Sequence, residues 1–166
     1  MNGRPGPNRL AAVLALLVVL HFTVRPWLGA DQRPAPDLLL LALLVYAIRA
    51  RPGAAAMAGF VVGLLSDALT PVAFGAGALA HTVVGYLAAW GKAVFFAENL
   101  AVSAGFFFAG TWMRDVLVLL GGGHVEGRQL LWQLLLWSPL KAATTALAGV
   151  VVLLVFRRWL AIRIAE

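Results

Sequence analysis

Few side chains in this sequence are able to do chemistry, and the nearest approach to a catalytic set is Ser66-Asp67 with His81. An intramembrane protease needs a serine with a histidine, or two aspartates, held at similar depth. Ser66 and Asp67 are neighbours on one predicted helix, so they do not easily lie on either side of the same imidazole. The sequence also has no cysteine, no Gly-rich phosphate loop, no G-x-S-x-G and no H-E-x-x-H. We therefore predict no catalytic residue, no metal site and no cofactor.

Five ionisable residues instead interrupt apolar stretches: Asp67, His81, Arg114, Asp115 and Lys141. Such residues are costly in lipid and usually face the interior of a helix bundle or a water-filled cavity. Adjacent helical residues do not face each other, so Arg114 and Asp115 should each pair with another helix. We expect the pairs Asp67 with Arg114 and Lys141 with Asp115, with snorkelling toward headgroups as the alternative. His81 is expected to be a packing residue and not a proton relay.

The composition indicates that most of this chain is surrounded by lipid. Of 166 residues, 62% are hydrophobic and 12% charged, against about 45–50% and about 25% in soluble domains. The net charge of +6 does not indicate nucleic-acid binding, because the basic residues lie between apolar runs and do not form one stripe. A soluble fold is therefore excluded.

Six membrane-spanning helices are predicted in a single membrane domain, residues 1–166. A span needs about 20 apolar residues, and the segment after Asp37 has only 11, residues 38–48. At about 16 Å, this second helix must be short, tilted or flanked by snorkelling arginines. The first stretch has the form of a signal peptide with a poor cleavage site, and we expect it to be retained. The expected spans are approximately 10–28, 37–50, 54–70, 72–91, 98–120 and 134–157.

The basic residues orient these spans by the positive-inside rule. With six spans, both termini are cytoplasmic, and eight basic residues lie on the inner side against three on the outer side. In this topology the ionisable residues of the spans all fall in the outer half of the bundle. The inner group is Arg4, Arg9, Arg49, Arg51, Lys92, Arg157, Arg158 and Arg163, and the outer group is Arg25, Arg33 and Arg128.

The last apolar stretch contains Ser138-Pro139, an N-cap residue followed by proline, which is a helix-start signature. Residues 130–137 then form either a separate helix at the outer surface or the first part of one long kinked helix.

Small residues predict the faces through which helices pack closely. Gly59 and Gly63 form a G-x-x-x-G pair, and Gly77, His81 and Gly85 share one face at a spacing of four. The expected packing glycines are Gly59, Gly63, Gly75, Gly77, Gly85 and Gly149.

Several of these positions resemble the rod shape-determining protein MreD family. The likeness extends by motif over about residues 34–90, and by length and span pattern over the rest. His81, Arg114 and Asp115 do not correspond to that pattern. The matching positions are Pro36, Asp37, Gly59, Phe60, Gly63, Asp67 and Gly75.

The resemblance implies a non-enzymatic component of the bacterial cell-elongation machinery in the cytoplasmic membrane. It would bind the bitopic protein MreC and, through it, connect MreB filaments with peptidoglycan synthases. The family's fold is similar to the substrate-binding subunits of energy-coupling-factor transporters, with six helices and a polar cavity open outward. A substrate-capture subunit of a small-molecule transporter is therefore the alternative function, and self-association stays open. In either case the expected partner- or ligand-binding residues are Asp37, Asp67, His81, Arg114, Asp115 and Lys141.

Overall fold

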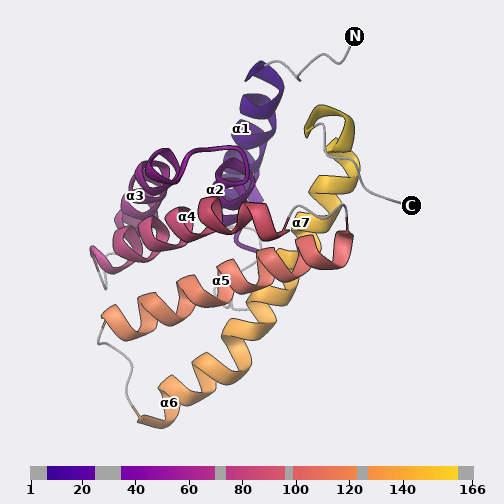
Figure 1. Cartoon of the computed structure of the whole chain (residues 1–166). Coiled ribbons are helices and arrows are strands. Elements are labelled where there is room, and N and C mark those ends of the chain that lie inside the picture. Colours follow the sequence, from indigo (N-terminus) through magenta and orange to yellow (C-terminus); the bar gives the residue numbers. More distant parts are fainter. Residues whose placement is uncertain (1–6, 25–34, 70–73, 96–98, 123–126, 161–166) are drawn as a thin grey trace.

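The computed structural model describes residues 7–24, 35–69, 74–95, 99–122 and 127–160. These segments are helices with short connections and contain no strand, which confirms the predicted all-helical class (Figure 1). The end of the predicted first span, 25–28, and Arg4, Arg25, Arg33 and Arg163 lie outside the described residues. The elements are α1 (Pro7–Val24), α2 (Leu38–Ala47), α3 (Pro52–Leu69), α4 (Ala76–Phe95), α5 (Leu100–Gly122), α6 (Gly127–Trp132), the π-helical turn η3 (Gln133–Trp137) and α7 (Ser138–Leu160).

Three helical segments in the described part of the chain are long and apolar enough to cross a membrane: Pro52–Leu69, Leu100–Gly122 and Gly127–Phe156. Two further apolar helices are shorter, Asn8–Val24 and Leu38–Ala47. The chain therefore has the helices of a membrane protein. The count of six spans stays a prediction.

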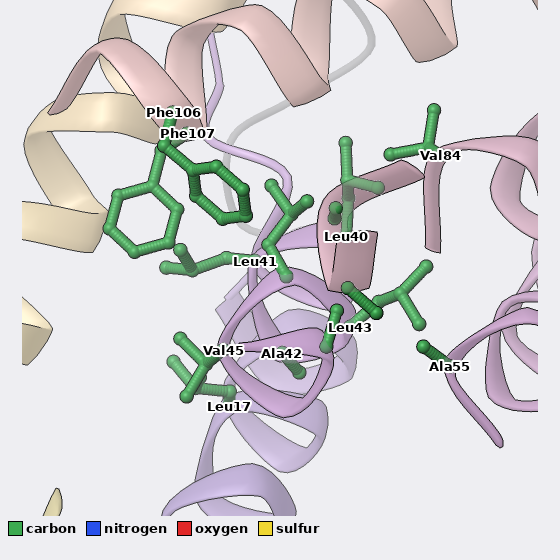
Figure 2. Packing of buried hydrophobic residues seen from close by; sticks show 14 of the residues in the cluster. Leu17, Leu40, Leu41, Ala42, Leu43, Val45, Ala55, Val84, Phe106 and Phe107 are labelled. Carbon is green, nitrogen blue, oxygen red and sulfur yellow. The ribbon is translucent and has the colours of Figure 1, made fainter. Parts of the chain in front are cut away.

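Helix α2 is short because it lies inside the protein and not in lipid. Its 10 residues are apolar on every side, and eight of them are buried, as expected of a helix enclosed by others. At about 15 Å it is about half as long as a hydrocarbon core is thick, and α1, α3, α4, α5 and α7 all pack around it. Of the three alternatives for this segment, the short helix is the one that the structure shows. Figure 2 shows its side chains among those of its neighbours, including Leu17, Ala55, Val84, Phe106 and Phe107.

Helix α3 packs on α4 with their backbones almost in contact. The buried residues of α3 recur at every fourth position, so they form one narrow face. A Cβ added at Gly59 would meet the main-chain carbonyl of His81, and one at Gly63 would meet the backbone of Ala78. The reciprocal position on α4, Gly85, lies against the carbonyl of Ala55. Only residues this small allow such an approach.

The remaining expected packing glycines differ in role. Gly77 lies against the carboxylate of Asp67, and Gly149 lies under the ring of Phe107. Gly75 has a φ of +98° with nothing within 4 Å of an added Cβ. Its expected packing role is therefore wrong, because the turn before α4 requires a left-handed conformation that glycine adopts freely.

Helices α6 and α7 are joined through η3 into one continuous helix, so the second alternative for residues 130–137 is the observed one (Figure 1). The backbone N–H of Ser138 donates to the carbonyl of Gln133, five residues back, and Pro139 has no N–H to donate. The carbonyl of Leu134 thereby loses its usual α-helical donor. The indole Nε1 of Trp112 on α5 donates to it instead, at 3.4 Å.

A pair of glycine substitutions tests the α3–α4 contact. Gly63→Ala should lower the free energy of unfolding by roughly 1–3 kcal/mol, because its methyl group would overlap the backbone of α4. Gly105→Ala on α5 is the matched control, since nothing lies within 4 Å of its added Cβ. It should leave stability unchanged or raise it by up to about 1 kcal/mol. Thermal and denaturant unfolding in detergent measures both, and equal effects would contradict the close packing.

Candidate functional site

The buried start of α2 is organised by Asp37. Its Oδ1 accepts a hydrogen bond from the N–H of Leu40 at 3.1 Å, and its main-chain carbonyl accepts from Leu41 at 2.9 Å. Its own N–H donates to the Thr145 hydroxyl on α7 at 3.0 Å. The first N–H groups of a helix lack intrahelical acceptors, and an aspartate N-cap supplies one of them. Asp37 therefore makes it possible for α2 to begin inside the protein.

Two cations, Arg114 on α5 and Lys141 on α7, neutralise two carboxylates at this point. The Arg114 guanidinium pairs through Nη2 with Asp37 Oδ2 and through Nη1 with Asp115 Oδ1, the latter at 2.8 Å. Lys141 Nζ lies 3.6 Å from Asp37 Oδ2 and 3.5 Å from Asp115 Oδ1. These four side chains, here called the charged cluster, join α2, α5 and α7 and have a formal net charge of zero.

Two histidines lie beside the charged cluster. His21 Nδ1 accepts from the N–H of Leu39 at 3.3 Å, so this nitrogen carries no proton and its 3.9 Å approach to Asp37 Oδ1 is not an ion pair. His81 Nδ1 lies 2.7 Å from the carbonyl of Gly77, so it is the donor. His81 also interacts electrostatically with Asp37 and Arg114.

Of the two expected pairings, the structure shows one and corrects the other. Lys141 does pair with Asp115, as expected. Arg114 does not pair with Asp67, and it does contact its own neighbour Asp115. The Cβ atoms of adjacent helical residues point in different directions. The arginine side chain is nevertheless long enough to bring its guanidinium group back to the Asp115 carboxylate. Of the six expected site residues, five lie in or beside the charged cluster and Asp67 does not.

Asp67 caps a helix instead. Its Oδ2 accepts from the N–H groups of Gly75 at 2.8 Å and Ala78 at 3.0 Å, and its Oδ1 accepts from Gly77 at 3.1 Å. It therefore binds the free donors at the start of α4 from the end of α3. A carboxylate with three backbone donors is stabilised without a cation, which explains why Arg114 is not needed there.

The continuous last helix also changes the position of Lys141 along its helix. The predicted span, 134–157, placed Lys141 seven residues from its start. The helix in fact begins at Gly127, so Lys141 lies 14 residues, or about 21 Å, from that end.

Sequence reasoning missed His21 and Thr145 as members of this site. On α1, the buried residues Val13, Leu17 and His21 recur at intervals of four, which places His21 on the face that meets α2. That spacing was available in the sequence. Nothing in the sequence indicated that the Thr145 hydroxyl accepts a hydrogen bond from the Asp37 N–H.

The charged cluster holds α2, α5 and α7 together through ion pairs. Its described groups do not form a catalytic arrangement. Within the described ranges, no three His, Asp or Glu side chains are grouped as metal ligands. The Arg114 Nε, buried and without a hydrogen-bond partner, is the exception among the described buried side-chain nitrogens and oxygens. The outward cavity stays a prediction.

These features define a class: a helical membrane protein whose enclosed, half-length helix is anchored by buried charges. Residues 8–162 match the rod shape-determining protein MreD family, so the chain belongs to this family. The resemblance from residues 34–90 is thereby confirmed over nearly the whole chain. The family functions in rod shape determination and is not a known enzyme family. The chain matches no curated protein and no solved structure.

A double-mutant cycle tests the charged cluster. Asp37→Asn retains a capping oxygen but leaves Arg114 short of a counter-charge, and Arg114→Met leaves the carboxylates with only Lys141. Each should lower the free energy of unfolding by about 3–5 kcal/mol. The double variant should be less destabilised than the sum, with a coupling of at least about 1.5 kcal/mol.

The control cycle combines Asp67→Ala with Arg114→Met. The two residues share no partner, so their effects should add within about 0.5 kcal/mol. Additive effects for Asp37 with Arg114, or strong coupling for Asp67 with Arg114, would contradict the observed pairing.

Proposed function

We propose that this protein is a non-enzymatic scaffold of the bacterial cell-elongation machinery in the cytoplasmic membrane. It binds a single-span MreC-like partner and through it connects MreB filaments with peptidoglycan synthases. The observation that carries the proposal is the family match over residues 8–162.

The internal architecture suits a scaffold because it fixes helix positions. The charged cluster ties α2 to α5 and α7, and His21 ties α1 to the same point. The α3–α4 pair is held separately by backbone contact and by the Asp67 cap. Buried ion pairs of this kind resist rearrangement, because breaking one leaves an uncompensated charge. A partner would therefore meet a preformed surface.

The helix lengths are compatible with a six-span topology. Helices α1 and α3 have 18 residues, α4 has 20 and α5 has 23, which correspond to roughly 27–35 Å. Helix α2 occupies about half of the depth while enclosed by the others. The Gly127–Phe156 segment of 30 residues, about 45 Å, exceeds a hydrocarbon core of about 30 Å. Its α6 end should therefore extend toward the outer surface.

Cysteine labelling tests this topology on a chain that has no native cysteine. Asn8, at the start of α1, and Arg128, at the start of α6, are both exposed. A six-span topology would put them on opposite sides of the membrane, and each is replaced by cysteine in turn. A membrane-impermeant maleimide should label Arg128→Cys in spheroplasts, and label Asn8→Cys only after the membrane is permeabilised. Labelling of both in intact spheroplasts would exclude a cytoplasmic amino terminus.

Partner binding is tested by co-expression with the MreC-like protein of the same genome. The tagged chain should recover that protein at near one-to-one ratio in mild detergent. A form of the partner whose spanning helix is replaced by an unrelated one should be recovered less well. Depletion of the chain should make rod-shaped cells round. Failure of both the recovery and the change of shape would reject the proposal.

A further inference from the structure

One donor in the charged cluster has no acceptor. Arg114 is 7% exposed, and its two terminal nitrogens hold Asp37 and Asp115. Its Nε–H is buried without a hydrogen-bond partner. A buried donor of a charged group that stays unsatisfied is unfavourable, so this position is suited to a further acceptor oxygen.

Three of the four carboxylate oxygens of the charged cluster already have partners. Asp37 Oδ1 accepts from Leu40, and Asp37 Oδ2 is shared by Arg114 and Lys141. Asp115 Oδ1 is likewise shared by both cations. Both cations thus share the same two oxygens, and neither oxygen accepts from Arg114 Nε.

The electrostatics favour an anion at this point. The formal charges of the four side chains cancel, and the amino-terminal end of α2 adds about half a positive charge. Helix starts of this kind are common anion sites. Here the N–H groups of Leu39, Leu40 and Leu41 are already bound, so the ligand would meet the side-chain donors.

Lys141 gives access to the charged cluster. Its side chain is 21% exposed, whereas those of Asp37 and Arg114 are each 9% exposed. An arginine paired with a lysine suits phosphate, which offers several acceptor oxygens. One oxygen can accept from Arg114 Nε while another contacts Lys141 Nζ.

We propose that Arg114 and Lys141 form a binding site for a phosphate group, carried by a lipid headgroup or by free phosphate. The inference concerns a ligand of the charged cluster and is independent of partner binding. Its measurement uses the purified full-length chain alone, so its failure is distinguishable from failure of the scaffold proposal.

The test measures thermal unfolding with two probes. Inorganic phosphate is added to the protein in neutral detergent against sodium chloride of equal ionic strength. In parallel, the protein is placed in nanodiscs of phosphatidylglycerol with phosphatidylcholine, or of phosphatidylcholine alone. At about one hundred times the dissociation constant, a site-bound ligand should raise the unfolding temperature by about 5–10 °C.

Two variants locate the site. Lys141→Gln should weaken phosphate-dependent stabilisation at least tenfold in apparent dissociation constant. Arg114→Lys keeps the charge but removes the Nε donor, and should weaken it similarly. Arg128→Gln, an exposed arginine on α6, is the matched control and should bind as the unmodified chain does.

Stabilisation by phosphatidylglycerol alone would support a lipid headgroup, and stabilisation by inorganic phosphate alone would support the free ion. No stabilisation of the unmodified chain by either probe would overturn the proposal, whether or not the variants fold. So would equal loss in Arg128→Gln and Lys141→Gln, because that result indicates unspecific attraction to a basic protein.

Discussion

The structure depends on a helix that begins inside an apolar interior. The N–H groups at such a start need acceptors that lipid cannot provide. Asp37 satisfies one from within α2, and His21 satisfies another from α1. The charge of Asp37 then requires cations, which α5 and α7 supply as Arg114 and Lys141. The placement of three neighbouring helices thus follows from the start of the shortest one.

The two buried aspartates show how one residue type fulfils the same requirement in different ways. Asp37 caps its own helix and needs cations because few backbone donors reach it. Asp67 caps the next helix and receives three backbone donors. The first solution joins helices that are distant in sequence, while the second closes a local pair. As a result, α3 and α4 are coupled mainly to each other, through residues small enough for their backbones to meet.

The sequence predicted those features that depend on composition and local spacing. The helical class, the glycine face of α3 and the pair of Lys141 with Asp115 were all accessible in this way. The pair of Asp67 with Arg114 was not, because similar depth in two spans does not determine which residues meet around a bundle. The roles of His21 and Thr145 depend on α2 starting between α1 and α7, a tertiary arrangement that no local pattern specifies. For the segment after Asp37, the sequence left open a short helix, a tilted one or flanking snorkelling arginines, because it did not show that other helices enclose α2.

The π-helical turn before Ser138 affects how the last helix relates its two halves. A π-helical turn takes in about one residue more than an α-helical turn, so the α-helical spacing of the residues on its two sides is offset by one residue, or about 100°. The exposed apolar side chains of Leu131 and Trp132 therefore do not follow the α-helical spacing of Lys141 and Thr145, although all four residues belong to one continuous helix. A one-residue deletion within 133–137 that restored regular α-helical geometry would therefore leave both halves facing as they do now, because the turn takes in its extra residue within one rotation. The last helix can thus change its length by one residue at this point without redirecting either surface.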